Sequence, residues 1–521
     1  MLNKKIISLS ICIVLLGAMF SGCVEEQTDE VKIEVPQELT IGISSDPGRG
    51  AHYGLLGAHV YETLVGVAPG VLEPIPMLAT HWNISQDRLT WTFHLRQGVK
   101  FHDGTPFTSE AVKFSFERML EMFEPAHGIL QIESMKILDS HTINITTTRP
   151  WAALIAHLSH PVGHIMNPTS FDEEENIIKH IGTGPFKYYK HCIEERLIVV
   201  RNENHWQGVP KLEKITFAII PDAHTRIMAL EAGEIDVTQW VPPEEVAWLD
   251  ARPGITVLTT PSVRTDFLIF NSETKPFDNI LVRQAVNYAI NQGDLVEYLL
   301  DGHGIPARGA ISPTIRWSIH EDLPEFRFNP EKAKELLSEA GWEDTDDDGI
   351  LDKNGESFSI TFLLSGRLPH WVPIAEAIQA QLREVGIIVE LKVLEFGALR
   401  DAAGTPEDRP LDKHLFFSSS GTWAGDADYI LYLTYHTNFN RWSSRHIDAD
   451  ELIEKGLGTI NDNERFVIWG DVQRKILETD LAVYLLIQQE IVAIRDHVHG
   501  FQAHPNQRMA HVPLWEVYVT G

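Results

Sequence analysis

The sequence predicts an α/β fold with more than one lobe. Short apolar strands alternate along the chain with helices that begin at capping residues and end at glycines, which is the pattern of layered α/β domains. A length of 521 residues exceeds what one hydrophobic core usually serves. The composition is that of an ordinary globular protein, with 43% hydrophobic and 22% charged residues, and it argues against disorder.

The N-terminal segment predicts export and a membrane tether. The apolar run Ile6–Phe20 follows a basic start, is short for a membrane span and has the proportions of an export signal. A Ser-Gly pair directly before Cys23 resembles the lipobox of exported lipoproteins, in which the cysteine becomes the lipidated first residue. We expect a signal peptide over residues 1–22 and a flexible acidic tether over residues 23–38, with an uncleaved anchor helix as the alternative.

The charge balance and the cysteines limit the classes of partner. The net charge of −30, from 43 basic and 73 acidic residues, argues against nucleic acid and against a surface that seeks anionic lipid. It fits either a plain solvated surface or a cationic or zwitterionic ligand. Cys12 lies in the predicted signal and Cys23 in the predicted lipidation site, so Cys192 stands alone and no disulfide framework is expected.

The first elements follow from strand, turn and cap signals. The segment "LTIGISS" at 39–45 predicts a strand, and "LTWTFHL" at 89–95 alternates apolar and polar residues as a half-buried strand does. The turn "HDGTP" at 102–106 separates that strand from a helix, which Thr108 or Ser109 is expected to cap.

The same pattern of strands, helix caps and terminating glycines continues further along the chain. A strand is expected to end at Pro221, Asp222 to cap a helix that Gly233 closes, and another strand to begin at Ile235. A later helix has Asn329 as its cap, with proline in the first turn and glycine past the end. A further helix, followed by glycine and a strand, carries apolar residues at helical spacing, namely Ile374, Ile378, Leu382 and Val385.

Five segments, in order, resemble signature segments of the peptide/nickel solute-binding proteins of ABC importers. They are "LTWTFHLRQGVKFHDGTPFTSEAVKFSFERM" (89–119), "GTGPFKY" (182–188), "VRNENHWQGVPKLEKITFAIIPD" (200–222), "FNSETKPFDNILVRQAVNYAIN" (270–291) and "FNPEKAKELLSEAGWEDTDDDGILDKNGE" (328–356). Each segment alone is a weak signal, but together they identify the chain as resembling this family.

The resemblance implies a two-lobed periplasmic-binding-protein-like fold of type II, in the large peptide-binding class, with a ligand cleft between the lobes. Lobe I would comprise residues 39–265 and 490–521, with an extra subdomain inserted at about 80–182. Lobe II would comprise residues 266–489. Members of the family close around a ligand, which is a population shift toward a closed state that the ligand stabilises.

The resemblance also points to the segment "GTWAGDADYI" at 421–430 as the ligand site. In the family's peptide binders a Trp-x-x-Asp segment supplies the aspartate that meets the peptide's α-ammonium, and the match here is Trp423 to Asp426. Such a pair makes charge-assisted hydrogen bonds. Trp423 would form a rigid apolar wall, and Gly425 would let the ligand backbone approach. A surface acid without a ligand is the alternative for Asp426.

Asp428 is the second acid of this segment. It is a weaker candidate for ligand binding, with a helix cap as its alternative role. Nickel-binding members resemble Trp-Gly-x-Pro-Tyr at this place, where the present chain has Asp426 and Ala427 in the last two positions. The difference favours peptides over a metal chelate as cargo.

Two groups of residues are candidates for metal binding. The segment at 344–352 resembles a calcium loop, although the glutamate expected at its twelfth position is absent; its candidate ligands are Asp344, Asp346, Asp348 and Asp352. His157, His160 and His164 have spacings that suit a helical metal site, but Pro161 interrupts any such helix. Solvated turns and surface histidines are the alternatives.

The sequence therefore predicts an extracytoplasmic solute-binding component of an ABC importer. We expect it to bind short oligopeptides by their free amino end, to be a monomer anchored at the cell surface, and to work with permease subunits and their ATPases. A nickel or metal-chelate receptor of the same fold is one alternative, and an extracellular hydrolase is another. No catalytic motif such as G-x-S-x-G or H-E-x-x-H is present, and no cofactor is expected apart from the calcium candidate.

Overall fold

The computed structural model describes residues 35–521 apart from ten gaps. The gaps are residues 47–54, 69–71, 175, 326–327, 367, 369, 404–413, 423, 438–447 and 507–511. The predicted signal peptide, its Cys23 and nearly all of the tether lie outside the described residues, as does Trp423. Residues 36–521 form one compact unit. Within the described part of the chain, no helix has the length and apolar character needed to cross a membrane.

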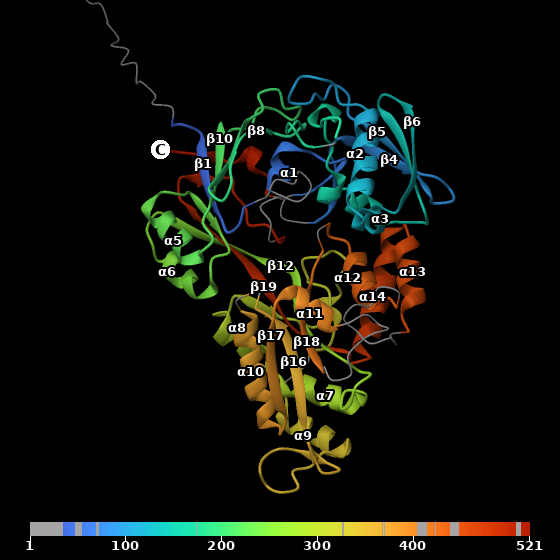
Figure 1. The fold of residues 1–521 in the computed structure, drawn as a ribbon, viewed down its shortest axis with the longest axis vertical. Helices are drawn as coiled ribbons and strands as arrows, with labels where there is room; N and C mark the ends of the chain where they lie inside the picture. The colour runs from blue at the N-terminus through green and yellow to red at the C-terminus, as the bar shows by residue number, and fades with distance from the viewer. Residues whose placement is uncertain are drawn as a thin grey trace, which may run out of the picture. The chain divides into compact units, whose positions relative to one another are not determined.

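One large mixed sheet organises this unit (Figure 1). Eleven strands take part among the described residues. In spatial order they are β17 (Ile388–Leu394), β16 (Ser359–Ser365), β18 (Leu415–Ser420), β12 (Ile255–Phe270), β19 (Ala482–Arg495), β11 (Val237–Gln239), β1 (Glu38–Ile43), β10 (Lys214–Ile219), β9 (Arg196–Arg201) and β8 (Phe186–Cys192), with β13 (Gly304–Pro306) beside β19.

The sheet contains two sets of parallel strands. β1 runs parallel to β10 and β11, and β16 runs parallel to β17 and β18. In open α/β sheets, ligands bind beyond the carboxyl ends of parallel strands. The loop that follows β18, from Gly421 to Ala427, starts at such an end.

The long antiparallel strands β12 and β19 join the two parallel sets (Figure 1). The first part of β12 lies beside the part of β19 that pairs with β11, and its last part pairs with β18. The pairing of β12 with β19 shifts register between Pro261 and Thr265 and again between Asp266 and Phe267. Such bulges bend a strand and increase its twist.

A separate antiparallel sheet lies within the predicted inserted subdomain. Its order is β4 (Ala79–Ile84), β5 (Thr90–Leu95), β7 (Thr142–Thr147) and β6 (Ile132–Asp139). β5 and β7 alternate partly buried and buried residues, and the amphipathic helix α2 (Ser109–Met122) shares their apolar core.

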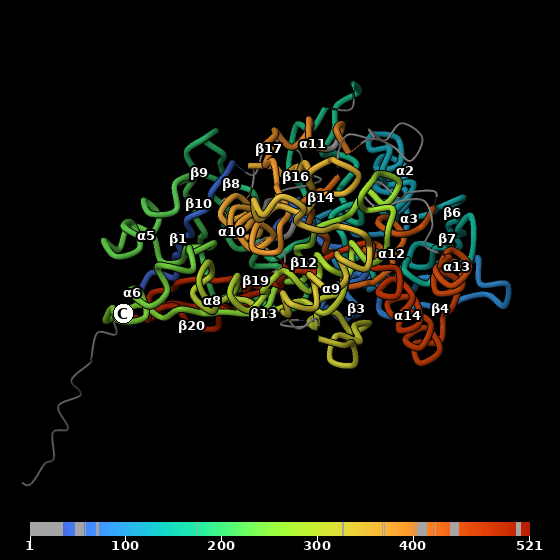
Figure 2. The backbone as a smooth tube through the Cα atoms, turned by 90° about the horizontal axis from the view of Figure 1, so that it is seen from below, coloured from blue at the N-terminus to red at the C-terminus, as the bar shows by residue number. Residues whose placement is uncertain are grey.

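That core continues into a helical group from the C-terminal third of the chain. Helices α12 (Asp428–Tyr435), α13 (Asp450–Gly458) and α14 (Asp462–Leu477) contribute buried residues to the same cluster as β5 and β7. Figure 2 shows α12, α13 and α14 beside the four-stranded sheet. A second core lies around β16 and α10 (Trp371–Glu384), where Ile374, Ile378 and Leu382 are fully buried.

The other elements are short or lie around these cores. The helices are α1 (Leu55–Val60), α3 (Pro125–Leu130), α4 (Leu154–His157), α5 (Ala223–Ala232), α6 (Val246–Asp250), α7 (Ile280–Ala289), α8 (Gln292–Leu299), α9 (Pro330–Glu339) and α11 (Phe396–Ala403). The small strands are β2 (Val65–Val67), β3 (Pro74–Pro76), β14 (Asp352–Lys353), β15 (Glu356–Ser357), β20 (Val498–His499) and β21 (Tyr518–Val519).

The predicted elements agree closely with these bounds. Asp222 caps α5 by accepting from Thr225, and Asn329 caps α9 in the same way. Thr108 is the N-cap of α2, although its side chain makes no capping hydrogen bond. The strand expected to begin at Ile235 begins two residues later, as β11.

The predicted lobe boundaries both fall inside continuous strands. The boundary at 265/266 lies within β12, between its two bulges, and the boundary at 489/490 lies within β19. These positions are where the ribbon passes from one parallel set to the other. The assignment of residues to lobes itself stays a prediction.

Candidate functional site

The predicted ligand segment lies between the carboxyl end of β18 and the start of α12. Its acid Asp426 is 2% exposed and forms a two-point ion pair with Arg465 of α14, which is equally buried. Asp426 Oδ2 accepts from Arg465 Nη1 at 2.6 Å, and Oδ1 accepts from Nη2 at 2.9 Å and from the backbone N–H of Asp428 at 3.1 Å. A carboxylate has about four acceptor positions. Three of those of Asp426 are therefore occupied by donors from the protein.

The burial of Asp426 contradicts one alternative of the sequence analysis, in which this residue is a surface acid. Its counter-charge comes from within the protein, because Arg465, 39 residues further along the chain, pairs with it. Burial raises the pKa of Asp426, and the guanidinium of Arg465 opposes that rise. The role of Asp426 toward a ligand ammonium stays a prediction.

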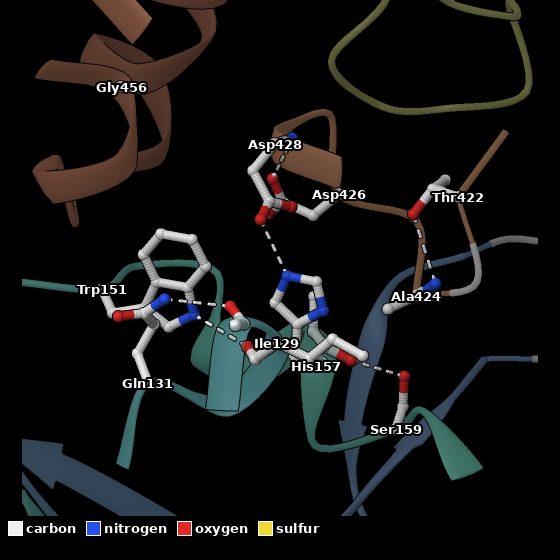
Figure 3. A network of polar contacts seen from close by, with 12 residues as sticks. Ile129, Gln131, Trp151, His157, Ser159, Thr422, Ala424, Asp426, Asp428 and Gly456 are labelled. Atoms are coloured by element: carbon white, nitrogen blue, oxygen red, sulfur yellow. Dashed lines mark hydrogen bonds and ion pairs between the residues drawn. The ribbon is translucent and has the colours of Figure 1, made fainter. Parts of the chain in front are cut away.

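Asp428 begins α12 and pairs with His157 at the end of α4 (Figure 3). Its Oδ2 lies 2.8 Å from His157 Nε2, and both residues are almost completely buried. Asp428 Oδ1 is buried and has no hydrogen-bond donor among the described residues. The segment therefore carries two buried carboxylates, and the carboxylate of Asp428 has fewer hydrogen-bond donors than that of Asp426.

The pKa values of this pair follow from mutual attraction. Burial alone would lower the pKa of His157, but the charge and hydrogen bond of Asp428, together with the charge of Asp426, outweigh burial and raise it. Burial alone would raise the pKa of Asp428, but the charge and hydrogen bond of His157 outweigh burial and lower it. Both shifts favour the ionised pair.

The pair is part of a wider contact between segment 149–158 and the group α12–α14. The backbone N–H of Ala152 donates to Leu457 O at 2.9 Å, and Arg149 pairs with Glu454 at 3.0 Å. Trp151 stacks on the His157 imidazole with an interplanar angle of 11° and donates its indole N–H to Ile129 O (Figure 3). His157 is thus held by aromatic stacking and by charge.

Gly425 packs closely against Leu72. Its φ is +74°, in the left-handed region that favours glycine. A Cβ built at this position would lie 2.5 Å from both the side chain and the carbonyl oxygen of Leu72. The small residue is therefore needed for close packing against Leu72, whereas its predicted contact with a ligand backbone stays untested.

The structure also brings together a polar cluster that sequence reasoning missed. Asp266 of β12 accepts from His370, Trp371 and Gln488, at 3.1, 3.3 and 3.0 Å. Arg264, two residues earlier, donates from Nε to Ser419 Oγ at 3.3 Å. These residues come from three strands and from the start of α10, so no local motif announces them.

The metal candidates gain partial geometric support. Ligand atoms of Asp344, Asp346 and Asp348 lie within 4.8 Å of one another, and all three residues are exposed. Asp352 instead lies in β14, where its carboxylate accepts from Thr345. Exposed acids often gather without an ion, so calcium binding stays a prediction.

Two of the three histidines in the predicted metal site make other contacts in the structure. His157 is bound to Asp428, and His160 caps a short 3₁₀ turn by accepting from the N–H of Val162. In the described chain, the metal-competent groups do not include any of the three histidines.

A cavity of about 390 Å³ lies elsewhere, against α8 and β13. Its lining includes Arg308 and Glu325, which pair with each other at 2.6 Å. None of the residues predicted to bind a ligand lines it.

Comparison with known proteins places the chain among transport receptors. The Dipeptide-binding protein of Escherichia coli is 27% identical over 496 residues, with 88% of this chain and 89% of that protein covered. Heme-binding protein A of Haemophilus influenzae is 29% identical over 459 residues, with 81% of each chain covered.

Solved structures give the same result. The DppA protein of Helicobacter pylori in complex with the peptide STSA has a TM-score of 0.73 and 27% identity, covering 93% of this chain and 98% of its own. A nickel ABC transporter protein of Bacillus halodurans has a TM-score of 0.78 and 26% identity, covering 93% of this chain and 100% of its own.

The family itself is shown by a match over residues 73–442, which is well over half of the chain. The matching family is described as "Bacterial extracellular solute-binding proteins, family 5 Middle". Its two-lobed fold agrees with the two parallel strand sets and the ribbon that joins them. The chain therefore belongs to family 5 of the bacterial extracellular solute-binding proteins.

Proposed function

We propose that this protein is the receptor subunit of an ABC importer and that its cargo is a short peptide. Family members are solute-binding transport proteins and not enzymes, which weighs against the hydrolase alternative. The observation that carries the peptide assignment is the pair of relatives that share 27% identity over most of the chain, a dipeptide-binding protein and a protein in complex with a peptide.

The proposal places the ligand's amino end at the Asp426–Asp428 pair. Asp428 Oδ1 supports this placement, since it is a buried carboxylate oxygen without a donor among the described residues. An ammonium there would add a charge-assisted hydrogen bond in surroundings from which water is excluded. Arg465 would hold Asp426 in place while the ligand engages Asp428.

The test is a titration of intrinsic fluorescence, which the chain's 13 tryptophans make practical. Di- to pentapeptides are compared with their N-acetylated forms, which lack the ammonium. We expect free peptides to bind and acetylation to weaken binding. Asp428→Asn should reduce that discrimination, and Asp448→Asn, at an exposed acid, should leave it unchanged.

A nickel or metal-chelate receptor is the second candidate. It is favoured by the interior pairing of Asp426 with Arg465, which leaves that acid without an unpaired charge for an ammonium, and by the 26% identical nickel transporter protein. Binding of nickel with histidine, without binding of any peptide, would select this candidate. Hydrolysis of an added peptide would contradict both.

Localisation outside the cytoplasm is typical of the family, and a lipid anchor at Cys23 is part of the proposal. Mass spectrometry of the protein from its native membrane would show a chain that begins at a lipidated Cys23. A chain that retains residues 1–22 would indicate an uncleaved anchor instead.

A further inference from the structure

The chain contains two copies of the tripeptide that accepts N-linked glycans. This sequon is Asn-x-Ser or Asn-x-Thr with any residue except proline in the middle, and its two copies are Asn83-Ile-Ser85 and Asn144-Ile-Thr146. A pattern of three residues is a weak signal in a sequence. Its meaning therefore depends on where the fold places the two asparagines.

The fold brings the two asparagines into one row of the antiparallel sheet. Asn83 of β4 pairs with Thr92 of β5, and Thr92 pairs with Asn144 of β7. Residues directly opposite each other on neighbouring strands share one face of a sheet. Because neighbouring strands lie about 4.8 Å apart, the two asparagines stand about 10 Å from each other on the same face.

This face is turned toward solvent. Asn83 is exposed and Asn144 is half-buried. The opposite face of the same strands carries Trp91, Phe93 and Ile145, which lie in the core that the sheet shares with α12–α14. Since successive side chains of a strand point to opposite faces, groups attached at the two asparagines point away from that core. Figure 2 shows β4, β6 and β7 of this sheet at one end of the molecule.

The amide nitrogens of both side chains are available. Asn144 Oδ1 accepts from Thr92 Oγ1 at 2.9 Å, and no acceptor among the described residues takes a hydrogen from Asn144 Nδ2. Asn83 Nδ2 lies 3.4 Å from His94 Nε2, which is a long contact. An N-linked sugar replaces only one of the two amide hydrogens, so Asn83 keeps a donor for His94.

The neighbours on this face leave room for a sugar. Thr90, Thr92 and Thr146 are half-buried, and the hydroxyl oxygens of Thr90 and Thr146 lie 3.1 Å apart. Short side chains that bond to one another across strands form a low polar surface around the two asparagines.

A third asparagine lacks both features. Asn167 is followed by proline and threonine, and proline in the middle position excludes the sequon. Asn167 is also only 3% exposed, and its Nδ2 donates to Asp103 and Thr105 at 3.2 and 2.8 Å. It is therefore a negative control within the same chain.

We propose that Asn83 and Asn144 are N-glycosylation sites and that this face of the sheet carries glycan. The donor is a lipid-linked oligosaccharide outside the cytoplasm, the location that is typical of the family. The anomeric carbon of the sugar forms a bond to Nδ2, and its bond to the lipid phosphate breaks. The amide loses one proton and the lipid phosphate departs as the leaving group. The inference does not depend on which cargo the protein binds.

The experiment is mass spectrometry of proteolytic peptides and of the intact chain, purified from the cells that produce it. We expect the peptides with Asn83 and Asn144 to carry an oligosaccharide and the peptide with Asn167 to have its sequence mass. A double variant, Asn83→Gln with Asn144→Gln, is expected to lose the whole mass increase of the intact chain.

Variants at Thr146 test whether the sequon directs the modification. Thr146→Ala keeps Asn144 but breaks the sequon, so it is expected to lose the glycan at Asn144. Thr146→Ser keeps the sequon and is expected to retain the glycan. Thermal unfolding checks that each variant folds; if Thr146→Ala fails to fold, the peptides of the wild-type protein decide.

The outcomes decide the inference directly. A glycan on either asparagine, with none on Asn167, would support the assignment of this face. Sequence masses for the peptides of both Asn83 and Asn144 would overturn it. A glycan that persists at Asn144 in Thr146→Ala would also overturn it, because the modification would then not follow the sequon.

Discussion

Arg465 holds both carboxylate oxygens of Asp426, at 2.6 and 2.9 Å, in the interior of the protein. The two residues come from the loop after β18 and from α14, so the ion pair fixes the predicted ligand segment to the helical group. The backbone N–H of Asp428 also donates to Asp426, which orients the start of α12. The pair therefore supports the geometry of the segment whether or not Asp426 itself contacts cargo.

Breaking this pair is expected to destabilise the protein strongly. Asp426→Asn leaves a buried guanidinium without its counter-charge, and such changes cost about 3–5 kcal/mol. Urea unfolding measures the loss. Asp471→Asn is the matched control, because it breaks the exposed pair with Arg474 and should cost less than about 1 kcal/mol. Equal losses in the two variants would contradict a structural role for the interior pair.

Stability is expected to depend on pH through His157 and Asp428. The raised pKa of His157 means that its contribution is complete below its ordinary pKa of about 6.5 and disappears as pH rises through the raised value. The lowered pKa of Asp428 means that its contribution is present above about 3.9 and disappears as pH falls through the lowered value. The pair is therefore fully effective between about pH 4 and 6.5.

His157→Gln measures this dependence. The difference in unfolding free energy between wild type and variant should be largest in that window and should shrink as pH rises above the raised pKa of His157. His127→Gln, at an exposed histidine of α3 in the same subdomain, should show no such profile. A difference that is the same inside the window, well below pH 4 and well above the window would contradict an ionised pair.

The packing of Gly425 against Leu72 predicts a large effect of a single methyl group. Gly425→Ala combines a left-handed φ with a contact of 2.5 Å to backbone and side chain, so both strain and overpacking oppose it. Gly104→Ala is the control, because Gly104 has a φ of +88° but no atom within 4 Å of the added Cβ. The control should cost about 1 kcal/mol and Gly425→Ala clearly more, measured by thermal unfolding. Equal losses of stability in the two variants would show that Leu72 moves aside readily, which would contradict the prediction.

Much of the fold follows from local signals. Some signals involve residues only a few positions apart, namely the caps Asp222 and Asn329 and the apolar face of α10. Their elements could therefore be placed from the sequence. The strand order of the large sheet could not be predicted in this way, because neighbouring strands such as β1, β11 and β19 come from distant parts of the chain. The family resemblance supplied the two-lobed architecture that periodicity alone did not.

The site was predicted only in part for the same reason. The acids at 426 and 428 stood out beside each other, but their partners Arg465 and His157 lie 39 and 271 residues away in sequence. The polar cluster around Asp266 had no local mark either, because its members come from three strands and from the start of α10.

The most direct test of the central claim is calorimetric titration of the purified protein with one short peptide in two forms, free and N-acetylated. We predict saturable binding of the free peptide and weaker binding of the acetylated form. Absence of binding by both forms, with tight binding of a nickel chelate, would contradict the peptide assignment.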